Sequence, residues 1–121
     1  MAGDHVFVYG TLRRGGSNSF RMDGAEFVGA ATVRGKLYPI SWYPGLVLDE
    51  AADLVKGEVF RVSAEQLAAL DAFEGPEYRR VRTEAITASG ERLSAWIWEW
   101  AMPVDGRKPI AGGDWLEHSG V

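Results

Sequence analysis

The chain has 121 residues, of which 46% are hydrophobic and 25% are charged, a composition typical of globular proteins, and we expect one domain spanning residues 1–121. It has no cysteine, which excludes disulfides and thiolate chemistry. Its two histidines lie near opposite ends of the chain, which argues against a histidine-based metal site or catalytic triad. A net charge of −4 without a block of like charge argues against nucleic-acid binding, although Arg79, Arg80 and Arg82 could form a local basic patch.

The first residues do not have the pattern of a secretion signal. Met1 is followed by Ala-Gly-Asp-His, which lacks the charged and the apolar segments of a signal peptide. No apolar stretch approaches the ~20 residues that a membrane-spanning helix needs. We therefore expect a cytoplasmic protein with no membrane partner.

The first part of the chain has the pattern of strands separated by glycine-rich turns. Residues 5–9 are apolar on both faces, which predicts a central strand covered on two sides. A loop over residues 10–16 and a short helical turn over residues 17–22 follow. Residues 25–37 predict one long bent strand or two short ones, because two glycines interrupt a sequence rich in β-branched residues.

Turns and short strands continue the pattern. Tyr38-Pro39 and Tyr43-Pro44-Gly45 are turn signals, and residues 46–48 predict a brief strand. Residues 55–62 predict a further strand.

One helix is strongly indicated. Ser63 begins Ser-Ala-Glu-Gln, the spacing of a capping box with Gln66 at the third helical position. Gly75-Pro76 is the expected end of this helix.

Two longer strands then form a predicted hairpin over residues 78–87 and 91–100. The alternation of Trp96, Trp98 and Trp100 along the second strand is more typical of a core or barrel lining than of a recognition surface. The tail over residues 103–121 is irregular, with Gly112-Gly113-Asp114 able to cap a final short helix. Strands outnumber helices, so the sequence predicts an α+β fold: a small, strongly curved sheet or barrel with one packed helix.

Glu74 is the first candidate for chemistry. It shares a helix face with Leu67 and Leu70, so its carboxylate points toward the apolar side of the helix at the last turn. Partial burial and the negative end of the helix dipole would both raise its pKa, toward the range where a general base works best. The alternative is a frayed helix end with its carboxylate in water. Glu77 is a rival carboxylate in the following loop.

The loop after the first strand is the second candidate. Gly10 and Thr11, in the sequence Tyr9-Gly10-Thr11-Leu12, can expose their N–H groups where the sheet ends. Consecutive free N–H groups form a nest suited to a carboxylate or an oxyanion. The alternative is an ordinary turn.

Taken together, three segments resemble the gamma-glutamylcyclotransferase-like superfamily. Residues 6–15, Val-Phe-Val-Tyr-Gly-Thr-Leu-Arg-Arg-Gly, are similar to its N-terminal strand and signature loop. Residues 70–75, Leu-Asp-Ala-Phe-Glu-Gly, followed by Tyr78, are similar to its Leu-Asp-x-x-Glu-Gly…Tyr segment. Residues 103–115, with Pro-Val-Asp-Gly and Gly-Asp-Trp, resemble the tail of a small bacterial subgroup.

The resemblance implies a small mixed barrel with a cavity for a γ-glutamyl group. Backbone amides of residues 9–12 would meet the α-carboxylate or carbonyl oxygen of the substrate, and Tyr78 lies near a substrate-contacting tyrosine of the family. Glu74 matches the family's acid/base, which moves the proton when the α-amine attacks its own γ-carbonyl and releases 5-oxoproline. This chemistry implies a small-molecule γ-glutamyl substrate and no metal or other cofactor.

Several alternatives stay open at this point. Members of the subgroup can lack the acid equivalent to Glu74 and keep one beside the tyrosine, so Glu77 is the alternative catalytic residue. A non-catalytic module that binds an amino-acid-like ligand in the same cavity, or an interaction scaffold with a vestigial pocket, would also fit. We expect substrate specificity to depend on residues 38–45 and on the tail.

Overall fold

Strands account for more of the described chain than helices do, as the sequence predicts. The computed structural model of the protein describes residues 3–119, so the expectations for Met1-Ala2 and for the last two residues of the tail lie outside the described residues. The elements, in chain order, are β1 (Asp4–Val8), the 3₁₀ helix η1 (Ser19–Met22), β2 (Glu26–Pro39), β3 (Pro44–Leu48), β4 (Leu54–Val62), α1 (Ala64–Glu74), β5 (Tyr78–Thr87), β6 (Arg92–Trp100) and α2 (Trp115–Ser119).

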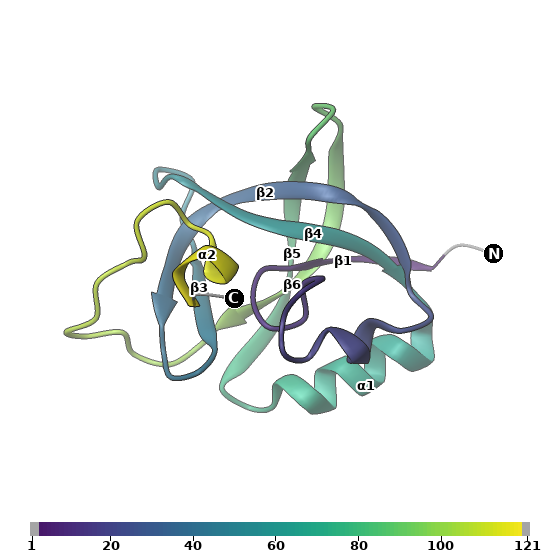
Figure 1. Cartoon of the computed structure of the whole chain (residues 1–121), viewed down its shortest axis with the longest axis horizontal. Coiled ribbons are helices and arrows are strands. Elements are labelled where there is room, and N and C mark those ends of the chain that lie inside the picture. Colours follow the sequence, from purple (N-terminus) through teal and green to yellow (C-terminus); the bar gives the residue numbers. More distant parts are fainter. Residues whose placement is uncertain (1–2, 120–121) are drawn as a thin grey trace.

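The strands close into a small barrel. The sheet order is β3-β2-β4-β1-β6-β5, and an additional pairing of β2 with β5 closes five of these strands into a ring, with β3 attached to β2 outside it. β1 runs parallel to β6 and the other pairs are antiparallel, so the barrel is mixed. In Figure 1, α1 lies along one side of this barrel. The predicted mixed barrel with one main packed helix is confirmed.

The alternation of β1 divides the core into two clusters. Phe7 and Tyr9 belong to the cluster that includes Val33, Leu46 and Ile97, whereas Val6 and Val8 belong to the cluster that includes residues of α1. Because successive side chains of a strand point to opposite faces, β1 is buried on both sides. This explains why Val6, Phe7 and Val8 are all apolar.

The helix α1 begins and ends as predicted. The Gln66 N–H donates to the Ser63 side-chain oxygen at 3.1 Å, which is the expected N-cap. Gly75 follows the helix with φ of 79°, a conformation that residues with a Cβ avoid. Leu67 and Leu70 are buried against the barrel. The helix therefore delivers its last residue, Glu74, to the end of the barrel where β1 also ends.

The turn signals Tyr38-Pro39 and Tyr43-Pro44-Gly45 flank one turn, which includes Tyr43, whereas Tyr38, Pro39, Pro44 and Gly45 belong to strands. β2 is one strand that continues to Pro39, and β3 begins at Pro44, which pairs with Pro39. Proline lacks an N–H but is tolerated at the first or last residue of a strand, so it does not by itself mark the turn. The turn is confined to residues 40–43. β2 is also irregular between Phe27 and Gly29, which accounts for its predicted bend.

The tail returns to the barrel and ends in the predicted short helix. The Ile110 N–H donates to the Leu37 carbonyl at 2.7 Å, and the Lys56 N–H donates to the Gly113 carbonyl at 2.8 Å. Trp115, the first residue of α2, is buried in the barrel cluster. The Glu117 N–H donates to the Asp114 side chain at 3.3 Å, so Asp114 is the cap. The tail is therefore anchored to β2 and β4.

The arginine cluster on β5 has acidic neighbours. Arg80 lies 2.8 Å from Asp71, and Arg79 and Arg82 each have a carboxylate oxygen within 4.0 Å. The guanidinium groups of Arg80 and Arg82 also lie over the ring of Trp96, while Trp98 is buried, as its predicted role in the core requires.

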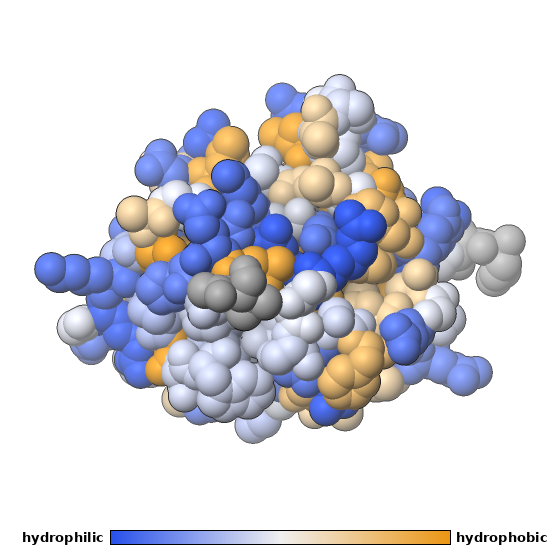
Figure 2. Space-filling view, in the orientation of Figure 1, coloured by the Kyte–Doolittle hydropathy of each residue, from blue (hydrophilic) through white to orange (hydrophobic). Residues whose placement is uncertain are grey.

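Figure 2 shows one face of the molecule, on which polar residues predominate and apolar residues form separate patches. Among the described residues, we find no helix whose length and apolar character would let it cross a membrane.

Candidate functional site

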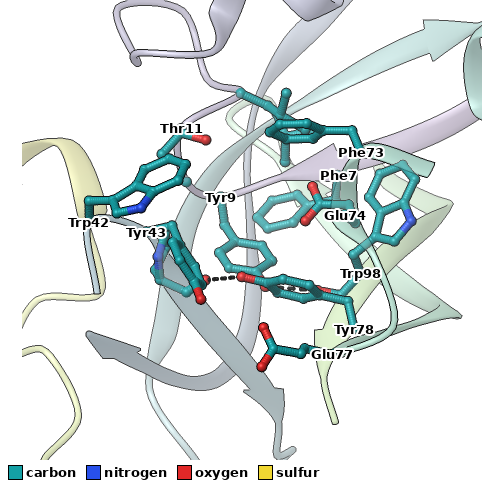
Figure 3. A pocket seen from close by; sticks show the side chains of 14 residues that line it. Phe7, Tyr9, Thr11, Trp42, Tyr43, Phe73, Glu74, Glu77, Tyr78 and Trp98 are labelled. Carbon is teal, nitrogen blue, oxygen red and sulfur yellow. Dashed lines mark hydrogen bonds between the residues drawn. The ribbon is translucent and has the colours of Figure 1, made fainter. Parts of the chain in front are cut away.

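A cavity of about 230 Å³ lies where the end of β1, the β2–β3 turn and the end of α1 meet (Figure 3). Pockets for drug-sized ligands usually measure about 300–1,000 Å³, so this cavity suits a small metabolite. It brings together every site residue that the sequence singled out. The lining residues are Phe7, Val8, Tyr9, Gly10, Thr11, Leu12, Trp42, Tyr43, Pro44, Phe73, Glu74, Glu77, Tyr78 and Trp98.

The loop after β1 has free N–H groups. Within residues 3–119, the N–H groups of residues 10–12 donate no hydrogen bond, and the first donor after them is the Arg13 N–H, which donates to the Gly10 carbonyl at 3.1 Å. The Thr11 carbonyl accepts from the Asn18 N–H at 2.9 Å, so the loop is tied back on itself. Adjacent free N–H groups in a held loop are suited to bind a carboxylate or an oxyanion.

Gly10 allows this loop to lie against β3. A Cβ built on Gly10 would lie 2.7 Å from Cγ of Pro44 and 2.8 Å from its Cδ, which is closer than such atoms approach each other. Both residues line the cavity. The glycine therefore sets the distance between the loop and the β2–β3 turn.

Glu74 is half-buried in the same cavity. Burial, reinforced by the negative charge of Asp71, raises the pKa of its carboxyl from an ordinary value of 4.5 to about 7. Burial disfavours the charged form because the carboxylate loses its water, and a second carboxylate repels it. The sequence analysis predicted the raised pKa and its first cause. The second cause of the raised pKa is the charge of Asp71 and not the helix dipole that the sequence suggests.

Asp71, which the sequence did not single out, connects the end of α1 to the barrel. Its Oδ1 accepts hydrogen bonds from Trp98 Nε1 at 2.8 Å and from Arg80 Nε at 2.8 Å. Asp71 and Glu74 are three residues apart, a spacing that places two side chains together on a helix. That spacing was the signal in the sequence for the interaction between the two carboxyl groups.

Two tyrosines on the cavity wall have fixed hydroxyl groups. Tyr78 donates to the Pro44 carbonyl at 2.7 Å, and Tyr9 donates to the Trp98 carbonyl at 2.7 Å while accepting from the Leu46 N–H at 3.1 Å. Burial, with a smaller contribution from nearby acidic groups, holds the pKa of each hydroxyl above its ordinary value of 10.0. Both tyrosines are therefore neutral near pH 7.

The rival carboxylate, Glu77, also lines the cavity but is exposed to solvent. In Figure 3 the ring of Tyr78 lies between the carboxylates of Glu74 and Glu77. The two acids therefore have different surroundings: Glu74 lies among Phe7, Phe73 and Trp98, and Glu77 lies on the side of Tyr78 away from them.

Aromatic residues of the β2–β3 turn complete the wall. Trp42 and Tyr43 pack edge to face, with ring centroids 5.0 Å apart, and 64% of Trp42 remains exposed. The sequence analysis placed specificity in residues 38–45 and in the tail. The turn does line the cavity, whereas no described residue of the tail does, and the dependence of specificity on these segments stays a prediction. The tail packs against the barrel instead.

Residues 3–119 contain no group of three or more His, Cys, Asp or Glu side chains placed to hold a metal ion.

The chain is similar to known proteins over most of its length. Residues 6–117 match the sequence model of the family described as gamma-glutamyl cyclotransferase, AIG2-like. The chain is 40% identical over 115 residues to the gamma-glutamylcyclotransferase family protein YtfP of Escherichia coli strain K12, an alignment that covers 93% of this chain and 96% of YtfP.

Two crystal structures have the same fold. An uncharacterised protein from Pyrococcus horikoshii is 32% identical, with a TM-score of 0.76 over 95% of this chain and 92% of that one. An AIG2-like protein from Mus musculus is 26% identical, with a TM-score of 0.77 over 87% of this chain and 82% of that one. The barrel with its loop and helix-end carboxyl is thus a gamma-glutamylcyclotransferase-like fold. This chain belongs to the AIG2-like gamma-glutamyl cyclotransferase family.

Proposed function

We propose that this protein is a gamma-glutamyl cyclotransferase that releases 5-oxoproline from a γ-glutamyl amine or a small γ-glutamyl peptide. One observation carries the proposal: a half-buried carboxyl with a pKa of about 7, Glu74, lines the same small cavity as the loop whose N–H groups are free. The family membership and the relatives' names support it. We further propose that residues 1–121 act as one domain.

The proposed reaction is an intramolecular acyl transfer. The α-amine of the γ-glutamyl group attacks its own γ-carbonyl carbon, a new C–N bond closes the five-membered ring, and the C–N bond to the leaving amine breaks. Glu74 accepts the proton from the attacking amine and returns it to the departing amine, so its charge is restored. All atoms of both products come from the substrate. Holding the folded-back substrate supplies much of the rate, because the attack is intramolecular.

The loop would act on the charge that develops at the carbonyl oxygen. N–H groups of residues 10–12 are proposed to bind this oxyanion or the α-carboxylate of the substrate. Tyr78 and Tyr9 remain neutral and would shape the wall of the cavity. The aromatic turn at Trp42 and Tyr43 would then lie nearest to the leaving amine.

Glu74 is favoured over Glu77 by its surroundings. A general base works best when its pKa is near the pH of the reaction, and burial of Glu74 gives it such a pKa. Glu77 is exposed, so water competes for its carboxylate.

The test uses the two acids as a matched pair. Purified protein is incubated with a panel of γ-glutamyl dipeptides and γ-glutamyl amines, and 5-oxoproline is measured. We expect Glu74→Gln to lower kcat by at least ~10²-fold with ligand binding retained, and Glu77→Gln to keep activity within about threefold. Loss of activity in Glu77→Gln alone would transfer the catalytic role to that residue. Binding without turnover across the panel would point to a non-catalytic binding module.

A further inference from the structure

A buried charge cluster lies directly behind the candidate anion-binding loop. The Arg13 side chain is 12% exposed, and its Nη1 donates to Asp114 Oδ1 at 2.8 Å. Its Nε lies 3.8 Å from Glu58 Oε2, and Glu58 is only 7% exposed. The pair joins residues that are 101 positions apart in the sequence. A charge-assisted hydrogen bond with so little water around it is stronger and more directional than a surface ion pair.

The cluster acts on the loop from outside the cavity. Arg13 follows Leu12 in the chain, but Arg13 is not among the residues that line the cavity. The next residue is held as well, because the Arg14 N–H donates to Glu58 Oε1 at 2.8 Å. Two consecutive residues after the loop are thus attached to acidic side chains.

Asp114 is itself placed by the barrel. A Cβ on the preceding residue, Gly113, would lie 2.4 Å from the Leu54 carbonyl oxygen, so only glycine allows the tail to approach β4 this closely. The Gly113 carbonyl accepts from Lys56 N–H, and Trp115 on the other side is buried in the barrel core. The backbone on both sides of Asp114 is therefore held against the barrel, which fixes the position of the carboxylate. Burial alone would raise the pKa of Asp114, but hydrogen bonds from Arg13 and from the Glu117 N–H outweigh it and leave that pKa below its ordinary value.

We infer that Asp114 of the tail, through its hydrogen bond with Arg13, fixes the loop of residues 9–12 in the geometry that binds the substrate's oxygen. Asp114 and Arg13 are positioning residues in this view, and neither touches the substrate. The expected effect on kcat/KM rests on the proposed cyclotransferase function. The expected ordering of the loop by Asp114 is independent of that function.

The cluster allows the ion pair to be cut without leaving a lone charge. Removal of the Asp114 charge leaves Arg13 beside Glu58, one cation with one anion, so the large penalty for an uncompensated buried charge is avoided. Asn at position 114 keeps Oδ1, the atom that accepts from both Arg13 Nη1 and the Glu117 N–H, so the cap of α2 stays. We therefore expect Asp114→Asn to fold. What is lost is the negative charge that makes the hydrogen bond from Arg13 strong and directional.

The experiment compares Asp114→Asn with Glu117→Gln, which removes an exposed carboxylate from the same short helix. Formation of 5-oxoproline from the best γ-glutamyl substrate is measured against pH, and amide hydrogen exchange is followed over residues 9–14. We expect kcat/KM to fall about tenfold or more in Asp114→Asn, because displacements of ~1 Å can cost up to 10²-fold in rate. The pH midpoint set by Glu74 should stay in place. Exchange over residues 9–14 should be faster, with the change at the hydrogen-bonded N–H groups of Arg13 and Arg14. Glu117→Gln should match the wild type in every readout.

A second variant separates charge from geometry. Arg13→Lys keeps the positive charge beside Glu58 but loses the guanidinium Nη1 that donates to Asp114, so it should reproduce the losses of Asp114→Asn. The inference is overturned if Asp114→Asn keeps kcat/KM within twofold, or if exchange over residues 9–14 is unchanged. If the wild type forms no 5-oxoproline, the proposed function fails, while faster exchange in Asp114→Asn would still establish that the tail orders the loop.

Discussion

Asp71 and Glu74 lie three residues apart on α1, and the carboxylate of Asp71 raises the pKa of Glu74 beyond the effect of burial. Asp71 is held in place by Trp98 and Arg80, so this repulsion is built into the fold. A helix terminus that carried Glu74 alone would have a less perturbed carboxyl. The pair therefore tunes the proposed acid/base toward neutral pH.

The first prediction concerns this tuning. Asp71→Asn removes the repelling charge and leaves the guanidinium of Arg80 near the site, and both changes favour ionised Glu74. The acid limb of kcat/KM, with its midpoint at about 7 in the wild type, should move down by roughly 0.5–1 pH unit. Pre-steady-state or steady-state rates of 5-oxoproline release between pH 5 and 9 measure the shift.

Glu65→Gln is the matched control for this shift, since it removes an exposed carboxylate from the first turn of the same helix. Its pH profile should coincide with that of the wild type. A limb that stays at the same pH, or moves up, in Asp71→Asn would show that Asp71 does not set the pKa of Glu74.

The second prediction concerns the stability of the protein without substrate. The pKa of Glu74 is higher in the folded state, about 7, than its ordinary value of 4.5, so between these pH values the folded state holds a proton that the unfolded state has released. The contribution of Glu74 is therefore fully present below pH 4.5 and is lost as the pH rises through 7. Glu74→Gln should leave the free energy of unfolding nearly unchanged at pH 4 and raise it by about 1–3 kcal/mol at pH 8.

Denaturant melts at the two pH values measure this difference. Glu77→Gln, which changes an exposed carboxylate, should give the same stability as the wild type at both. A Glu74→Gln protein that is less stable than the wild type at pH 8 would mean that the ionised carboxylate is well solvated in the fold.

Much of the architecture could be predicted because local rules and packing agree. The apolar run of Val6, Phe7 and Val8 in β1 is explained by burial on both faces. The Ser63 cap and Gly75 bounded α1 within a residue. The helix-face argument placed Glu74 in the cavity because Leu67 and Leu70 share that face and are buried.

The rest depends on contacts between distant segments, which spacing along the chain does not encode. The sequences around Pro39 and Pro44 predict turns, although each proline occupies a strand end opposite the other. Likewise the sequence around Arg13 is that of a solvated loop, and its contact with Asp114 depends on how the tail folds back onto the barrel. The cavity wall at Trp42 could be placed only roughly, because the direction of a turn follows from the pairing of β2 with β3.

The third prediction concerns the close approach of the loop to β3. Gly10→Ala puts a methyl group 2.7 Å from Cγ of Pro44, so either the loop or the β2–β3 turn must move. We expect kcat/KM to fall by about 10–10²-fold, since the N–H groups of the loop would be displaced from the proposed oxyanion position. Gly29→Ala is the control, because a Cβ there would meet nothing within 4 Å. Equal activities of the two alanine variants would contradict the role given to this contact.

The last prediction concerns the hydroxyl of Tyr78. Tyr78→Phe removes the donor of the 2.7 Å hydrogen bond to the Pro44 carbonyl and keeps the ring that packs edge to face on Trp100, with centroids 5.2 Å apart. Loss of one partly buried hydrogen bond costs about 1 kcal/mol, which corresponds to a fall in Tm of roughly 3–5 °C for a chain of this size. Calorimetry measures the change, and Tyr43→Phe, another tyrosine of the cavity wall, is the comparison. Pro44 also lies against Gly10, so the turn that has lost its hydrogen bond should shift relative to the loop. We therefore expect kcat/KM to fall severalfold in Tyr78→Phe. A variant that melts at a lower temperature but keeps full activity would show that the hydrogen bond contributes to stability alone.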